Sequence, residues 1–313
     1  MEYLQEIQDI IIEMELSEKP IKEIAHYTSI DALNSIIDGI QMQESSKAYL
    51  TLRATSALKT DDPEELQEGS EFLMDILSHL EEDNPDKFRL SNYMNDVHNT
   101  QSLCHLSADD IRTWFLGGMR TLYIISFSRY IDQLSMWLLP YPKCGEGACL
   151  VFDFSLMNYS NDHLTIRPPF PIIYGKRLGY LNLKNGFLDL IWSEYGRYCK
   201  NVVSISEPEQ ITRYKLQALE VVYAFVTSYF KREKWHNQQE IRIMCTTLND
   251  NPSCVMTDAK NREYVEVPVP ITCLKQVILG PNVHDSQVGL IKEKLAPFGF
   301  ITNDIFKSKE PLR

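Results

Sequence analysis

The sequence predicts an α+β fold, with mixed or antiparallel central sheets and flanking helices. Three observations favour it. Runs rich in β-branched and aromatic residues dominate the middle of the chain, and segments with helical spacing gather towards its two ends. Strands and helices do not alternate as βαβ units would. The loop patterns GxGxxG and GxxxxGK[ST], which cradle phosphates in α/β proteins, are missing.

The helices are expected from apolar spacing and from their caps. Thr28 and Asp31 have the spacing of a capping box that would begin a helix after the strand at 24–27. The last helix before the C-terminus is expected over 285–297. The other expected helices span 2–17, 64–82, 108–117, 131–139 and 208–232.

The strands are expected where apolar or alternating runs lie between turn residues. A buried strand is predicted at Thr121–Ser128 and another at Gly147–Phe154, after a glycine-containing turn. Further strands are predicted within 169–180, at 240–245, 263–269 and 274–280, and near 300–305. We expect residues 1–313 to form a single domain, with an N-terminal helix in 1–20 and a polar insertion around 81–105.

The composition limits the classes of function. The 313 residues carry a formal net charge of −12, which disfavours non-specific binding to nucleic acid or to anionic membranes. No apolar run approaches the roughly 20 residues that span a bilayer. The seven cysteines include no CxxC pair, and the chain begins without a signal peptide, so we expect free thiols in the cytoplasm and no membrane partner.

Three polar groups of residues interrupt the apolar strands and are the candidates for chemistry. They are His26-Tyr27-Thr28, then Ser126-Phe127-Ser128 with Trp137 after it, and Glu240 with Arg242. Each also has a structural interpretation. His26 would be a core histidine, Ser128 a helix N-cap, Trp137 a core residue, and Glu240 with Arg242 an ion pair at the surface, which contributes little stability.

The order of several short motifs resembles a known family. HYTSIDALNSII, DDPEE, SFSRYIDQLSMW, GACLVFDF, KREKWHNQQEIRI and VILGPNV look like the bacterial domain-of-unknown-function 2971 family over residues 24–313. The chain departs from the family where Thr60 precedes Asp61-Asp62-Pro63, in place of an asparagine before Asp-Pro. It departs again after Trp137, where Leu138-Leu139-Pro140-Tyr141 replaces the usual Ala-x-Tyr and glycine turn.

That family's layout is similar to ADP-ribosyltransferase-like proteins, which implies a split arrangement of the central sheets. It also implies NAD as substrate, and a catalytic set of His26, Ser126 or Ser128, and Glu240; of the two serines, we expect Ser128 to be the catalytic one. Tyr27, Thr28, Ser126, Phe127, Trp137 and Arg242 would then help His26 to bind NAD. The resemblance further implies a toxin or phage-defence effector that modifies a protein or nucleic acid and is held by an antitoxin or regulatory protein.

The chemistry of NAD suits these residue types. Cleavage of its glycosidic bond develops positive charge on the ribose, which a carboxylate such as Glu240 stabilises. Aromatic rings offer stacking surfaces, and an arginine can bind pyrophosphate or fix the carboxylate. No metal is required.

Three other hypotheses stay open. A metal-dependent nuclease or hydrolase would use Asp61, Asp62, Glu64 and Glu240. A non-catalytic binding or regulatory module would keep the fold without the reaction. A Ser-His-Glu hydrolase would use the same polar residues, but the sequence lacks a GxSxG elbow.

Overall fold

The computed structural model describes about half of the chain. The described residues are 23–42, 47–57, 122–140, 142, 144–157, 159, 163–166, 168–174, 228, 230–247 and 254–310. The chain divides into two compact units, one made of residues 1–20, 60–120 and 173–233, the other of residues 21–59, 121–172 and 234–313. Nearly all described residues belong to the second unit, so the single-domain prediction stays a prediction.

Several expected elements lie outside the described residues. These are the helices at 2–17, 64–82 and 108–117, most of the helix at 208–232, the insertion at 81–105, and the acidic residues Asp61, Asp62 and Glu64. In the first unit the structure describes a short parallel pair, β8 (Ile173–Tyr174) with β9 (Phe230–Lys231). The last residues of the helix predicted at 208–232 are therefore extended, and the prediction is wrong there.

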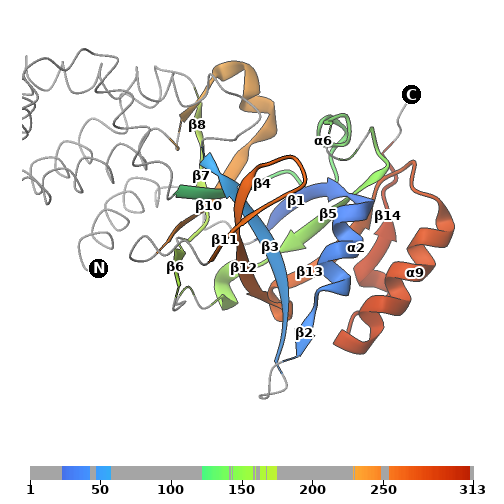
Figure 1. Ribbon diagram of the computed structural model, residues 1–313. Helices are drawn as coiled ribbons and strands as arrows, with labels where there is room; N and C mark the ends of the chain where they lie inside the picture. Colours follow the sequence, from blue (N-terminus) through green and yellow to red (C-terminus); the bar gives the residue numbers. More distant parts are fainter. Residues whose placement is uncertain are drawn as a thin grey trace, which may run out of the picture. The chain divides into compact units, whose positions relative to one another are not determined.

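The second unit is built on one large sheet (Figure 1). Its strands follow the order β11-β12-β3-β4-β1-β5-β13-β14, with β10 against β4, β6 and β7, and β2 against β3. All of these pairs are antiparallel except β13 with β14. The coarse fold class is confirmed, since the described residues combine a large mixed sheet with few helices.

The expected strands other than the last are found close to their expected bounds, but no strand was expected at 41–42, 48–56, 164–166 or 255–257. The strands are β1 (Ile24–Ser29), β2 (Gln41–Met42), β3 (Ala48–Ser56), β4 (Leu122–Ser128), β5 (Gly147–Phe152), β6 (Leu164–Ile166), β7 (Phe170–Pro171), β10 (Glu240–Thr247), β11 (Val255–Thr257), β12 (Glu263–Pro270), β13 (Leu274–Leu279) and β14 (Ile305–Lys307). The last strand is displaced from the predicted 300–305, because residues 302–304 form a 3-10 turn, η9.

Helices α2 (Ile30–Asp38) and α9 (Asp285–Leu295) lie beside each other near β5, β13 and β14 (Figure 1). Lys294 of α9 donates to Asp38 of α2 at 2.7 Å. The capping prediction is wrong by one residue. Ser29 is the N-cap of α2, and its Oγ accepts from the amide of Ala32 at 3.2 Å.

Helix α6 (Leu134–Trp137) is much shorter than the predicted helix at 131–139. Asp132 has φ 53°, outside the helical region, and the N-cap is Gln133. Ser128 is therefore not the helix cap that the sequence suggested. Short 3-10 segments complete the described part: η3 (Phe154–Leu156), η4 (Glu233–Gln238), η7 (Ile271–Cys273) and η8 (Ala296–Phe298).

Strand β4 is where the sheet divides. The amide of Arg129 donates to the carbonyl of Gln239, just beyond the pair Ser128–Glu240. The backbone amide and carbonyl groups of the odd-numbered residues of β4 therefore point towards β10. The backbone groups of the even-numbered residues point to the opposite edge of β4. There, Ile124 pairs with β3 and Ser128 pairs with β1. Two strands, β3 and β1, thus pair with the same edge of β4 at different positions along it. Ser126 lies between these two positions.

Candidate functional site

Glu240 and Arg242 lie on one face of β10, because side chains two apart on a strand point the same way. Arg242 Nε donates to Glu240 Oε1 at 2.7 Å, and the two side chains are only 2% and 5% exposed. The expectation of a surface ion pair is therefore wrong. A buried pair of charges must be closely matched and hydrogen-bonded, because each charge has left water.

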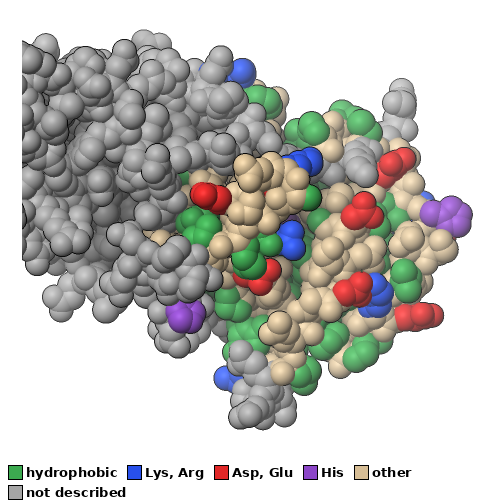
Figure 2. Space-filling model, in the orientation of Figure 1, with side chains coloured by type: hydrophobic (Ala, Val, Ile, Leu, Met, Phe, Trp, Pro, Cys, Tyr) green, Lys and Arg blue, Asp and Glu red, His purple; other side chains and the backbone are tan. Residues whose placement is uncertain are grey.

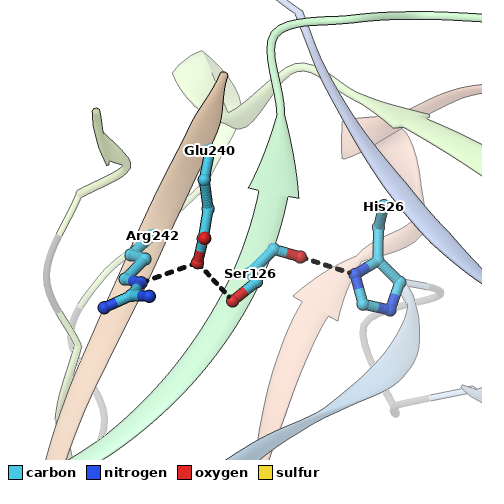
Figure 3. Close-up of polar contacts among 4 residues, drawn as sticks. All are labelled: His26, Ser126, Glu240 and Arg242. Carbon is cyan, nitrogen blue, oxygen red and sulfur yellow. Dashed lines mark hydrogen bonds and ion pairs between the residues drawn. The ribbon is translucent and has the colours of Figure 1, made fainter. Parts of the chain in front are cut away.

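Ser126 brings β4 into contact with this pair (Figure 3). Its hydroxyl donates to the same oxygen, Glu240 Oε1, at 2.7 Å. The contact follows from register, since Ser126 stands opposite Arg242 and therefore shares its face. Ser126 is exposed, although the other residues of β4 are buried. Of these three residues, it is the one that meets solvent.

The two serines of the SFS segment have different roles. Ser128 is 1% exposed, donates to the carbonyl of Gln238 at 2.7 Å and accepts from the amide of Tyr130 at 3.0 Å. Its hydroxyl therefore ties the end of β4 to the neighbouring backbone. The serine that hydrogen-bonds Glu240 is therefore Ser126, whereas the expected catalytic serine was Ser128, whose catalytic role stays a prediction.

His26 approaches Ser126 from the other edge of β4 (Figure 3). Its Nδ1 lies 2.9 Å from the carbonyl oxygen of Ser126. A carbonyl only accepts, so Nδ1 carries the proton and Nε2 of the neutral ring is an acceptor. Burial lowers the pKa of His26 below its ordinary value, and the hydrogen bond to Ser126 offsets part of that shift. The ring is thus neutral at pH 7.

Tyr27 and Trp137 form a separate, largely apolar cluster. Their rings meet edge to face with centroids 5.1 Å apart, and Trp137 is fully buried. The Tyr27 hydroxyl donates to the carbonyl of Tyr130 and accepts from the amide of Gln133, while Trp137 Nε1 donates to Asp132. Burial raises the pKa of Tyr27, so its hydroxyl keeps its proton. This cluster fixes the turn between β4 and α6.

Phe127 and Thr28 are also inside the protein. Phe127 is 3% exposed and packs edge to face on Phe152 and Phe154, with the ring of His26 at 5.5 Å between centroids. Thr28 is buried in β1 opposite Ala148. The NAD-binding roles predicted for these residues, and for Tyr27 and Trp137, stay predictions.

One residue at the site gave no signal in the sequence. Gln239 precedes Glu240 with φ 42°, a left-handed conformation that is uncommon for residues other than glycine. Its carbonyl accepts from the amide of Arg129, and its side-chain nitrogen lies 3.0 Å from Nε2 of His236. Such strain is kept where surrounding contacts enforce it. Here it places Glu240 at the first position of β10.

The structure therefore joins residues 26, 126 and 240, from three different strands, through two hydrogen bonds to Ser126. Arg242 completes the cluster from the side of Glu240 away from His26 (Figure 3). Among the described residues, no group of three or more His, Cys, Asp or Glu side chains could hold a metal ion. Within the same residues, no helix is long and apolar enough to cross a membrane.

The surface of the described part carries charges of both signs (Figure 2). Acidic and basic side chains are interspersed on the face shown, over the strands and the two helices. The net acidity of the chain is therefore not gathered into one acidic patch on this face. A mixed surface of this kind gives no extended basic footprint for a polyanion there.

Comparison with known proteins adds no family or function. No protein-family model matches the chain, and no match was found among curated proteins or solved structures.

Proposed function

We propose that this chain is an NAD-dependent ADP-ribosyltransferase with Glu240 as its catalytic carboxylate. One observation carries the proposal. A histidine, a serine and a glutamate on an early, a middle and a late strand are linked at Ser126, whose backbone carbonyl accepts from His26 and whose hydroxyl donates to Glu240. The division of the sheet at β4 supports the split ADP-ribosyltransferase-like arrangement proposed with it.

The reaction needs a fixed negative charge more than a strong base. As the bond between nicotinamide and the ribose C1 breaks, its electron pair leaves with the nicotinamide nitrogen and positive charge grows on the ribose. A preorganised carboxylate stabilises that charge at no cost in reorganisation. The nucleophile of the acceptor then bonds to C1, and its proton passes to the surrounding water.

Other groups of the cluster are suited to ribose hydroxyls. The Ser126 hydroxyl is exposed and bonded to Glu240, and Nε2 of His26 can accept a hydrogen bond from a hydroxyl. The proposal therefore rests on His26, Ser126 and Glu240. It does not need ligand stacking on Phe127 or Trp137, whose rings are buried.

The biological setting belongs to the same proposal. We propose a cytoplasmic toxin or phage-defence effector whose acceptor is a protein or a nucleic acid, with an antitoxin or regulatory protein as a further partner. The net charge of −12 favours a protein acceptor or a locally gripped nucleotide over extended binding to a polyanion.

The test is to follow label from NAD. The protein is incubated with bacterial lysate and NAD labelled in its adenylate phosphate, and the label is located after separation of protein from nucleic acid. We expect covalent label on one macromolecular fraction, lost in Glu240→Gln. No transfer and no NAD cleavage, under conditions where the protein is folded, would contradict the proposal.

The burial of Glu240 and Arg242 supports a second candidate, a non-catalytic binding module in which this pair only holds two strands together. A module of that kind would capture a partner tightly and leave NAD intact. Activity that requires a divalent cation and is abolished by a chelator would instead favour the metal-dependent nuclease.

A further inference from the structure

Arg242 is almost completely buried beside Glu240. Its side chain is 2% exposed, whereas Ser126, directly opposite it on β4, is exposed. A guanidinium is always charged in proteins, so this group must be matched within the protein. Glu240 Oε1 supplies a match at 2.7 Å from Nε.

The geometry defines what Arg242 does to Glu240. A single carboxylate oxygen, Oε1, receives two donors, Nε from its own strand and the Ser126 hydroxyl from the next. Two donors that arrive from different strands fix both the position of the carboxylate and the rotation about its last bond.

We propose that Arg242 is a positioning residue that acts through Glu240, and that it does not bind the pyrophosphate of NAD. This inference rests on the proposed function and narrows it. Arg242 touches the carboxylate that stabilises the ribose, and it lies on the side of Glu240 opposite His26 (Figure 3). Loss of such a residue impairs the transition state and leaves binding of the substrate largely unchanged.

The experiment measures nicotinamide release from NAD at several NAD concentrations for the parent, Arg242→Lys, Arg242→Met and Ser126→Ala. We expect kcat to fall at least about 10-fold in Arg242→Lys, because a lysine supplies a charge without the Nε geometry. KM for NAD should stay within about 3-fold of the parent. Ser126→Ala should also lower kcat, since it removes the other donor to Oε1, but it should raise KM as well, because the same exposed hydroxyl is suited to bind the ribose.

Arg262→Lys is the matched control. Arg262 also donates Nε to a carboxylate, that of Asp258 at 2.8 Å, but in the turn between β11 and β12 and with its side chain 38% exposed. This variant should keep both constants. If Arg242→Met does not fold, Arg242→Lys decides the question, with circular dichroism reporting the folded fraction.

Three results would overturn the inference. A KM raised about 10-fold or more with kcat retained would make Arg242 a ligand of NAD. Unchanged kcat and KM with a lowered melting temperature would make its role purely structural. Absence of nicotinamide release by the parent would overturn the proposed function and the inference with it. This third result is seen in the parent alone, whereas the first two require a parent that releases nicotinamide.

Discussion

Removing either charge of the buried pair should destabilise the protein far more than removing both. At the observed 2.7 Å between Nε and Oε1, the direct attraction is about 6 kcal/mol for an effective dielectric constant near 20. Most of it offsets the cost of taking the two charges out of water. In Arg242→Met the buried carboxylate of Glu240 loses its charged partner. In Glu240→Gln the buried guanidinium of Arg242 loses its charged partner. Each single variant should lose about 3–5 kcal/mol of unfolding free energy.

The double variant Glu240→Gln/Arg242→Met removes both charges of the pair. The introduced glutamine would still accept a hydrogen bond from Ser126, and the methionine would fill part of the arginine's volume. We expect a loss of no more than about 2 kcal/mol, hence a coupling energy of several kcal/mol between the two sites. Urea unfolding followed by circular dichroism measures all four proteins. Additivity of the single variants within about 0.5 kcal/mol would refute the reasoning.

The remaining predictions concern burial. The pKa of His26 is lowered in the folded state, so its contribution to stability is complete above about pH 6.5 and is lost as pH falls through the folded pKa. His26→Asn keeps an N–H donor but does not titrate, so its urea midpoint should depend less on pH between 7 and 5; parallel curves would contradict this. Burial raises the pKa of Cys149 to about 12, whereas Cys144 is exposed. Peptide mapping after brief alkylation should find Cys144 modified and Cys149 modified only after unfolding, and equal rates would count against the described core.

Most of the buried strands could be predicted because their signal is local, although β3 (Ala48–Ser56) was missed. Runs such as Leu122–Ser128 and Gly147–Phe152 are largely apolar on both faces, and the structure buries both faces of each except at Ser126. The same logic failed for residues 131–139. Their spacing is helical, but the contacts of Tyr27 and Asp132 hold the preceding turn in a conformation that delays the helix until Leu134.

The candidate site could be predicted only in part from the sequence. His26, Ser126 and Glu240 were identifiable as polar residues in apolar strands. The choice between Ser126 and Ser128 depends on what each hydroxyl meets: Glu240 in one case and the carbonyl of Gln238 in the other. No local pattern encodes that difference. Similarly, the spacing of two residues on one strand predicted that Glu240 and Arg242 would pair. Their burial could not be predicted, because it depends on strands that are distant in the sequence.

The most direct test of the account is the release of nicotinamide from NAD by the purified parent protein and by Glu240→Gln. Glu266→Gln makes the same chemical change at an exposed position of β12 and serves as the control. The account predicts release by the parent and by the control, and a rate lower by about 100-fold or more, per folded molecule, in Glu240→Gln. Release by Glu240→Gln within a few-fold of the parent, or no release by a folded parent, would contradict it.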